Sequence, residues 1–156
     1  MGQRSIWTIG HSSHTIERFI ALLQHHDIQV LADVRSKPGS RIHTQFNQAA
    51  FSSALAGAGI QYVHFADLGG KRSDMASYTA HMHTDAFKNG ITQLEALAQM
   101  QGVAYMCAEA LWWQCHRAKI SDHLFAKGWQ VLHIMGNNRV MAHKGAVKKM
   151  VQGSLF

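Results

Sequence analysis

The stretch V-A-Y-M-C-A-E-A-L-W-W-Q-C-H-R, which runs from Val103 to Arg117, decides the kind of fold that this chain can adopt. Its first part, Val103 to Cys107, is a short apolar run typical of a buried strand. The residues after Cys107 bring several chemically reactive groups together. A buried strand that ends in reactive side chains is typical of α/β sheets, in which ligands bind outside the carboxyl ends of the strands.

The reactive groups of this stretch suit acid–base chemistry and anion binding. Glu109 can exchange a proton, and Cys115 can act as a nucleophile. His116 titrates near neutral pH, and Arg117 can hold a carboxylate or a phosphate through two parallel hydrogen bonds. The stretch therefore has the composition of a functional site.

A helix is expected to begin at about Trp113 or Gln114, so that its free amides and positive end face whatever the reactive groups face. An alternative interpretation is purely structural. In that case Cys107 belongs to the core, and Glu109 and Arg117 form an ion pair that stabilises the fold.

The rest of the chain alternates between expected strands and expected helices. Further apolar runs predict strands at Ser5 to Ile9, Val30 to Val34, Ile60 to Phe65 and Val131 to Ile134. Helical spacing of apolar residues predicts helices after the capping residues Thr15, Asn47 and Thr84, and from about Trp113 to Gly128. This alternation implies right-handed crossovers and helices on both faces of a sheet. We therefore expect a single three-layer, Rossmann-like α/β domain with a mainly parallel five-stranded sheet.

Two segments fall outside this alternation. The segment from Lys71 to His83 has weak periodicity and is expected to be a loop or short helix over the site. The region from about residue 136 to residue 156 carries basic residues and no acidic one, so it is expected to be a solvated basic tail. An arm that contacts phosphates is the alternative for this tail.

The composition indicates one domain with a preference for anionic partners. With 156 residues, 47% of them hydrophobic, the chain suits one sizeable core, so the domain is expected to span residues 1–156. No apolar run approaches the roughly 18 residues that cross a bilayer. Two cysteines are too few for a secreted disulfide framework, so a cytoplasmic protein without a membrane partner is expected. The net charge of +6 favours ligands such as nucleotides, sugar phosphates or nucleic acid. The cofactor and the oligomeric state stay unknown at this point.

Polar side chains gather where the expected strands end. In chain order they are His11 and Ser12, Asp33 and Arg35, His64 and Asp67, Cys107 and Glu109, and His133. The pair Gly69-Gly70 follows the third strand and suits a tight turn or a close backbone approach to a ligand. Loops at the other ends of the strands carry no comparable set. The site is therefore expected at the carboxyl edge of the sheet.

These motifs resemble those of a known family. They are T-I-G-H-S at Thr8 to Ser12, D-V-R at Asp33 to Arg35, L-G-G at Leu68 to Gly70, and C-A-E with C-H-R between Cys107 and Arg117. In this order they are similar to the bacterial and archaeal family described as domain of unknown function DUF488, over nearly the whole chain. The resemblance implies a small stand-alone α/β domain with an unassigned activity. It supports the choice of site residues and says little about the reaction.

The first functional hypothesis is an enzyme, a hydrolase or a transferase, that acts on a phosphate-bearing substrate such as a nucleotide or nucleic acid. Arg35 and Arg117 would hold the anion. Glu109 and His11 would serve as acid and base, and Asp33 would orient a histidine or a ribose hydroxyl. The expected anion-binding set also includes Ser12, Gly69 and Gly70, and the expected catalytic set also includes Cys115 and His116.

In a variant of this hypothesis, Cys115 is the nucleophile, because a helix start would favour its thiolate. Adjacent residues of a helix point about 100° apart, so Cys115 and His116 cannot both face one atom squarely. Cys107, at the end of a buried strand, is expected to be an inert core thiol.

A non-catalytic nucleic-acid-binding module is the competing class. The R-S-K-P-G-S-R run from Arg35 to Arg41 and the basic tail would contact the backbone of the nucleic acid. Tyr78, Trp112 and Trp113 would offer faces for base stacking.

A metal-dependent hydrolase is a further alternative, because the chain has twelve histidines. Its ligands would be His11, Glu109 and His116. The spacings of histidine and cysteine match no standard structural zinc site, so no metal ligand is assigned.

Overall fold

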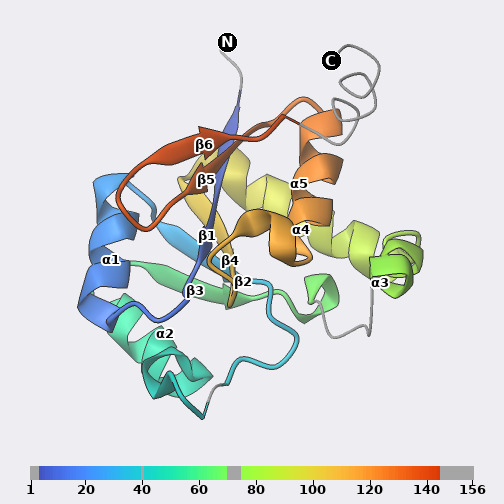
Figure 1. Cartoon of the computed structure of the whole chain (residues 1–156). Coiled ribbons are helices and arrows are strands. Elements are labelled where there is room, and N and C mark those ends of the chain that lie inside the picture. The colour runs from blue at the N-terminus through green and yellow to red at the C-terminus, as the bar shows by residue number, and fades with distance from the viewer. Residues whose placement is uncertain (1–3, 40, 70–74, 145–156) are drawn as a thin grey trace, which may run out of the picture.

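The computed structural model describes residues 4–39, 41–69 and 75–144. In this part of the chain a six-stranded sheet has the order β3-β2-β4-β1-β5-β6 (Figure 1). The strands are β1 (Ser5–Gly10), β2 (Val30–Asp33), β3 (Gln61–His64), β4 (Val103–Cys107), β5 (Gln130–Ile134) and β6 (Val140–Ala142). All neighbours pair in parallel except β6, which is antiparallel to β5.

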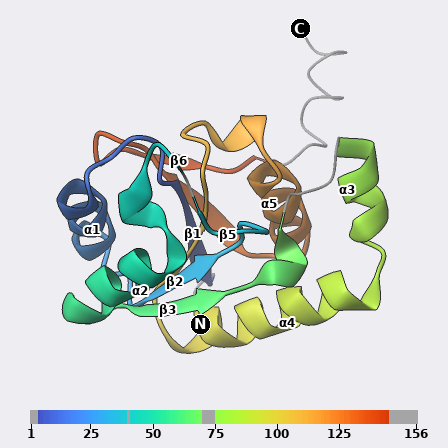
Figure 2. The ribbon, with the colours of Figure 1, turned by 90° about the horizontal axis from the view of Figure 1, so that it is seen from below.

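Helices cover both faces of this sheet, as Figure 2 shows. They are α1 (Ile16–His25), α2 (Gln48–Gly57), α3 (Met75–His81), α4 (Asp85–Met100) and α5 (Arg117–Ala126). Phe19 of α1 and Phe51 of α2 lie in one apolar core, whereas Phe87 of α4 and Ile120 of α5 lie in another. The sheet separates the two cores, so the expected three-layer α/β architecture is confirmed.

Two helix starts follow from side-chain caps. The hydroxyl of Thr15 accepts from the backbone N–H of Arg18 at 3.0 Å, and that of Thr84 accepts from the N–H of Phe87 at 3.2 Å. Each cap satisfies one of the amides that a first turn leaves without a partner. These caps fix where the polypeptide leaves the carboxyl-edge loops, and the expected starts after Thr15 and Thr84 are confirmed.

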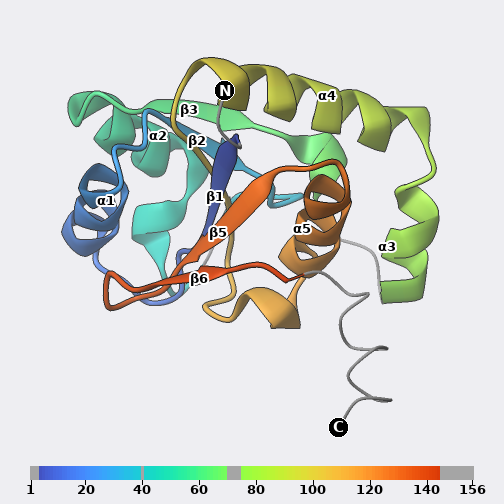
Figure 3. The ribbon, with the colours of Figure 1, turned by 90° about the horizontal axis from the view of Figure 1, so that it is seen from above.

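The sheet has six strands where the sequence predicts five. The sixth, β6, forms from Val140–Ala142, inside the segment that is expected to be a solvated tail. It lies beside β5 at the outer edge of the sheet (Figure 3). The region after it also contains His143, which is 5% exposed, so this part of the expected tail belongs to the folded domain. Residues 145–156 lie outside the described residues.

The last helix also begins later than expected. A short 3-10 helix, η3 (Trp112–Gln114), comes first, and α5 begins only at Arg117. The reason is the extended backbone of Cys115, with φ −145° and ψ −179°, which no helix can contain. The helical spacing of this segment predicts that Phe125 faces inward, but the residue is 37% exposed.

The centre of the sheet is a topological switch point. From β1 the chain crosses to β2 on one side, and from β4 it crosses to β5 on the other, although β1 and β4 are neighbours. Ligands of open α/β sheets bind in the crevice at such a point. The order differs from the 3-2-1-4-5-6 order of dinucleotide-binding domains, so the likeness to a Rossmann fold is one of layers.

Two smaller elements line the approach to this edge. The 3-10 helices η1 (Thr44–Phe46) and η2 (Ala66–Leu68) follow the loops after β2 and β3. In the segment expected to be a loop or short helix, the described part forms α3. None of the helices among the described residues is long and apolar enough to cross a membrane.

Candidate functional site

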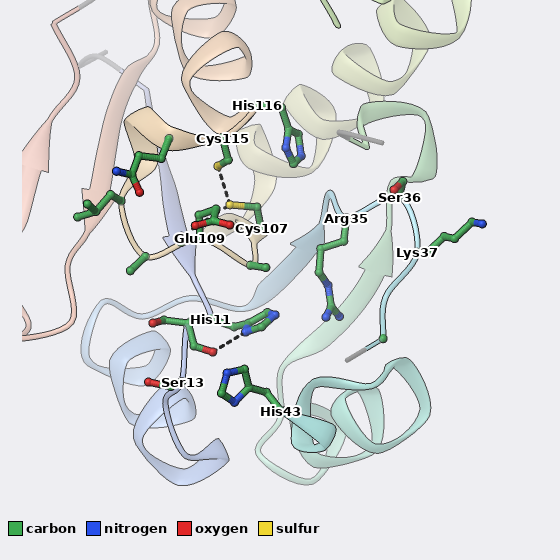
Figure 4. A pocket seen from close by; sticks show the side chains of 16 residues that line it. His11, Ser13, Arg35, Ser36, Lys37, His43, Cys107, Glu109, Cys115 and His116 are labelled. Carbon is green, nitrogen blue, oxygen red and sulfur yellow. Dashed lines mark hydrogen bonds between the residues drawn. The ribbon is translucent and has the colours of Figure 1, made fainter. Parts of the chain in front are cut away.

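A pocket of about 700 Å³ opens at the carboxyl ends of β1, β2 and β4 (Figure 4). The side chains that line it come from the loops directly after these three strands and from the approach to α5. Its lining residues include His11, Ser12, Ser13, Arg35, Ser36, Lys37, His43, Cys107, Glu109, Gln114, Cys115 and His116. Six residues of the expected site therefore meet in one cavity: His11, Ser12, Arg35, Glu109, Cys115 and His116.

The β1 side of the pocket carries a neutral histidine. His11 Nδ1 contacts the carbonyl oxygen of Ser12 at 2.9 Å, so Nδ1 carries the proton and Nε2 keeps its lone pair. Ser12 has a φ of 47°, a left-handed conformation that serine rarely adopts. Burial lowers the pKa of His11 to about 4, and the nearby charge of Arg35 acts in the same direction. At neutral pH, His11 can therefore accept a proton through Nε2.

The β2 side carries an arginine that is only partly used. Arg35 Nε and Nη2 donate to the two carboxylate oxygens of Asp33 at 2.9 Å and 2.7 Å. Tyr62 donates to the same carboxylate at 2.6 Å, and burial together with this bond raises the pKa of Tyr62. Among the described residues, Arg35 Nη1 is buried without a hydrogen-bond partner. A buried donor without a partner is costly, so Arg35 has one donor available for a ligand.

The β4 side carries two free thiols. Cys107 Sγ and Cys115 Sγ lie 2.8 Å apart, and the backbone N–H of Arg117 donates to Cys115 Sγ at 3.4 Å. The hydrogen bond from Cys107 lowers the pKa of Cys115 to about 6. Burial acts in the opposite direction and raises this pKa, whereas the positive charge of Arg117 lowers it further. Burial raises the pKa of Cys107 well above its usual value. These contacts therefore favour the thiolate form of Cys115, with Cys107 as its thiol partner.

Arg117 lies behind the wall of this pocket. Its Nε donates to Cys107 Sγ at 3.0 Å, and its Nη1 donates to Thr8 Oγ1 at 3.1 Å. Its Nη2 donates to the carbonyl oxygens of Glu109 at 2.7 Å and Ala110 at 3.3 Å. The side chain is 1% exposed, and every guanidinium nitrogen has an internal partner. A grip of Arg117 on a ligand, as expected from the sequence, would require these bonds to break.

A chain of hydrogen bonds continues from Arg117 to the surface. Thr8 Oγ1 lies 2.7 Å from His133 Nδ1, His133 Nε2 lies 3.0 Å from His143 Nδ1, and His143 Nε2 lies 2.7 Å from Asp122 Oδ1. We call Thr8, His133, His143 and Asp122 the relay. An arginine only donates hydrogen bonds and a carboxylate only accepts them. When both histidine rings are neutral, Thr8 therefore donates to His133, His133 donates to His143, and His143 donates to Asp122.

The relay is kept dry around His133. Burial lowers the pKa of His133 to about 2, and the neighbouring His143 and Arg117 add to the effect. The indole of Trp112 stacks on the His133 ring, with centroids 4.3 Å apart and planes 2° from parallel. His133 is therefore neutral at physiological pH and passes a hydrogen bond, without adding a charge.

Two glycines allow the close approaches that shape the site. A Cβ on Gly10, at the end of β1, would lie 1.8 Å from the carbonyl oxygen of Glu109. A Cβ on Gly69 would lie 2.6 Å from Cα of Ser36, a residue of the pocket lining. The close neighbour of Gly69 is thus a backbone segment of this chain, whereas the sequence suggested a turn or a ligand. Gly70 lies outside the described residues.

The remaining expected residues have assigned positions. His116 lines the pocket, and its Nε2 donates to the carbonyl of Val34 at 2.8 Å. Burial lowers the pKa of His116, which keeps it neutral. Glu109 reaches the pocket with an exposed side chain. Tyr78, expected to stack on bases, is 2% exposed and donates to the carbonyl of Leu68, so it offers no such face.

Sequence reasoning missed three features of the site. The first is the contact between Cys107 and Cys115, since Cys107 was expected to be inert. The second is the relay, whose histidines lie on opposite sides of the turn between β5 and β6. The third is the lining by Lys37 and His43. Of these two residues, only Lys37 could have been found from the sequence, because it belongs to the basic run after β2.

The described residues offer no arrangement for a metal. Among residues 4–39, 41–69 and 75–144, no three or more histidine, cysteine, aspartate or glutamate side chains are placed to hold a metal ion. The combination of His11, Glu109 and His116 is therefore not among such groups, and we assign no metal to the pocket.

Comparisons with known proteins identify a family and no activity. Searches of curated proteins and of solved structures gave no significant match. The model of one family, described as domain of unknown function DUF488, matches residues 15–124. This segment contains Arg35, Cys107, Cys115 and Arg117, with most of the pocket lining. Because the match covers more than half of the chain, this protein belongs to the DUF488 family.

Proposed function

We propose that this protein is an enzyme that uses the Cys115 thiolate as a nucleophile on a phosphate-bearing substrate, with nucleotides as the first class to test. The observation that carries the proposal is the position of Cys115 Sγ. It lines the pocket and accepts hydrogen bonds from the Cys107 thiol and the Arg117 backbone N–H. A thiolate stabilised in this way is reactive at neutral pH.

Groups that recognise an anion lie around the same cavity. Arg35 has a spare donor in Nη1. Lys37 belongs to the lining at the rim of the pocket, and its ammonium extends outward (Figure 4). The hydroxyls of Ser12, Ser13 and Ser36 also belong to the lining. Arginine, lysine and hydroxyl donors are the usual partners of a phosphate group. These contacts support binding of the substrate by its phosphate.

The reaction would then have two steps. The Cys115 thiolate forms a bond to phosphorus while the bond from phosphorus to the leaving oxygen breaks, and the leaving group takes a proton from water. His11 Nε2 next removes a proton from a water molecule. The oxygen of that water attacks phosphorus, and the bond between sulfur and phosphorus breaks. Phosphate leaves, and the thiolate is restored. Arg117 serves as a positioning residue, because it contacts the thiols and not the cavity.

Ligand binding tests the first half of this proposal. Purified protein under reducing conditions is titrated with nucleotides, sugar phosphates and short oligonucleotides, and the thermal midpoint is followed. A ligand at about 100 times its dissociation constant stabilises the fold by roughly 2.7 kcal/mol. Lys37→Ala should reduce this shift, and Lys88→Ala is the matched control, since it removes one charge from the exposed surface of α4.

Catalysis tests the second half. Any ligand that binds is incubated with the protein, and release of inorganic phosphate is measured. Cys115→Ser should abolish turnover and keep binding, and iodoacetamide should inactivate the wild type unless the ligand protects it. A shift with oligonucleotides alone, lost in salt and accompanied by no turnover, would instead support a nucleic-acid-binding module.

A further inference from the structure

The two sulfur atoms of the pocket are placed for chemistry with each other. Cys107 ends β4, and Cys115 follows η3, so the turn over residues 108–114 brings them together. Their sulfurs are 2.8 Å apart, and a disulfide bond is about 2.05 Å long. Closure therefore needs a movement of less than about 1 Å, which side-chain rotation can supply.

The two thiols differ in access. Cys107 is 2% exposed and lies against the Nε of Arg117, whereas Cys115 is partly exposed. A reagent that enters the pocket therefore meets Cys115 first. Cys107 lies directly behind it, within reach of any group that becomes attached to Cys115 Sγ.

We propose that Cys115 and Cys107 are the attacking and the resolving thiol of a dithiol–disulfide cycle, and that the pocket takes an anionic small-molecule disulfide as oxidant. This inference shares Cys115 with the proposed function but does not depend on a phosphate-bearing substrate. It assigns Cys107 a chemical role, where the sequence suggested an inert core thiol.

The exchange balances without a further reactant. The Cys115 thiolate attacks one sulfur of the small disulfide RSSR, which forms Cys115–S–SR and expels RS⁻. The Cys107 sulfur then attacks Cys115 Sγ, expels the second RS⁻, and gives its proton to that leaving group. The products are an intramolecular disulfide, one RS⁻ and one RSH, so two electrons pass from the protein to RSSR.

The environment favours a reversible cycle over a permanent bridge. The lowered pKa of Cys115 reflects stabilisation of the reduced form by Cys107 and Arg117. A disulfide whose reduced form is stabilised is comparatively oxidising and easily reduced. Arg117 Nε, at 3.0 Å from Cys107 Sγ, can also stabilise the negative charge that develops on Cys107 as its proton moves to the leaving group. An excess of the thiol RSH should therefore restore both thiols.

The charge of the pocket selects an anionic disulfide. Lys37 and the spare donor of Arg35 belong to the same lining as Cys115. They can hold carboxylates on the two arms of RSSR while its sulfurs reach Cys115. Oxidised glutathione, which carries several carboxylates, is the probe of choice, and bis(2-hydroxyethyl) disulfide is the neutral comparison.

The test is intact-mass analysis after acid quenching. Wild-type protein with oxidised glutathione should lose two hydrogens and carry no adduct, and a peptide map should join Cys107 to Cys115. Cys107→Ser, which keeps a hydrogen-bond donor beside Cys115, should stop at one glutathione adduct on Cys115. Cys115→Ser should stay unmodified. Wild type that accumulates a stable adduct, or Cys107→Ser that behaves as wild type, would overturn the proposal.

Rates test the choice of oxidant. The wild type should react faster with oxidised glutathione than with the neutral disulfide. Lys37→Ala should react with oxidised glutathione roughly three- to tenfold more slowly than the wild type, and its rate with the neutral disulfide should be unchanged. Lys88→Ala should change neither rate. Equal rates with both disulfides in the wild type would overturn the anionic specificity. Failure of nucleotide binding under reducing conditions would reject the proposed function and leave this result unaffected.

Discussion

Two arginines are buried at this site, and they handle their positive charge in opposite ways. Arg35 is neutralised by the carboxylate of Asp33 and keeps one nitrogen without a partner. Arg117 has no carboxylate partner among the described residues, and all its side-chain nitrogens donate to internal acceptors. Arg35 can therefore give a hydrogen bond to a ligand but little net charge. Arg117 can give charge to the thiols but no hydrogen bond to a ligand.

The number of arginines at a site therefore does not measure how well the site binds anions. A charge acts over several ångströms in a dry site, whereas a hydrogen bond requires a free donor. The Arg117 side tunes a nucleophile, and the Arg35 side recognises a ligand. Substitutions on the two sides should show this division of roles.

The strongest test exchanges each arginine for methionine. Arg35→Met should lose about 3–5 kcal/mol of unfolding free energy, because the buried carboxylate of Asp33 stays behind without its cation. Arg117→Met leaves neutral acceptors such as the Thr8 hydroxyl without their donor, at about 1–3 kcal/mol for each buried acceptor. Only Arg117→Met should raise the pH at which iodoacetamide alkylates Cys115, because the charge of Arg117 lowers the pKa of that thiol. Urea denaturation and pH-dependent alkylation give the two values. The division fails if Arg35→Met moves the alkylation midpoint equally.

Gly10 and Gly69 allow the same comparison through the backbone. Gly10→Ala forces a Cβ to 1.8 Å from the Glu109 carbonyl, which must separate β1 from the loop after β4. We expect a loss of at least about 3 kcal/mol. Gly69→Ala, with its nearest contact at 2.6 Å, should cost about 1–3 kcal/mol and affect ligand binding on the Arg35 side. Equal losses in urea denaturation would contradict this order.

Acid should destabilise both sides over different pH ranges. His11 and His133 have folded pKa values lowered from 6.5 to about 4 and about 2. Below pH 6.5 the unfolded chain therefore binds more protons, and stability falls as pH falls, by up to about 1.4 kcal/mol per pH unit for each histidine. The thermal midpoint of His11→Gln should depend less steeply on pH than that of the wild type, and only between pH 6.5 and 4. The thermal midpoint of His133→Gln should depend less steeply on pH than that of the wild type below pH 4 as well.

The smallest effect belongs to the surface end of the relay. Asp122→Asn keeps an oxygen that can accept from His143, so the unfolding free energy should fall by less than about 1 kcal/mol. Asp122→Ala removes the acceptor and should lower the unfolding free energy more than Asp122→Asn does. A large change in the pH at which iodoacetamide alkylates Cys115 in Asp122→Asn would show that the carboxylate charge itself reaches the thiols.

Contacts of this site between residues that are close together in the sequence could be predicted. Asp33 and Arg35 follow one strand, so their convergence at the carboxyl edge follows from the strand alone. The clustering of Cys115 and His116 after β4 is predictable for the same reason. The three-layer fold follows from alternating strand and helix patterns, which are also local signals.

The rest depends on contacts between distant segments. The burial of Arg117 requires Thr8, and the position of Thr8 requires the pairing of β1 with β4. The late start of α5 follows from the extended backbone of Cys115, whose side chain contacts Cys107. The strand β6 has only three residues and no alternating pattern, so its pairing with β5 decides its structure. No window of sequence around Arg117 or His143 contains this information.

The central position of β1 has a consequence for synthesis on the ribosome. β1 is made first, but its partners are β4 and β5, with Trp7 paired to Ala104 on one side and to Leu132 on the other. A newly made β1 therefore waits without sheet neighbours while more than half of the chain is translated, at roughly 5–20 residues per second. Thr8 reaches Arg117 only after that delay. The site at the carboxyl edge is thus among the last parts of the molecule to form. Until β1 is enclosed, both cysteines of a nascent chain are accessible, but Cys115 lacks the contacts that lower its pKa.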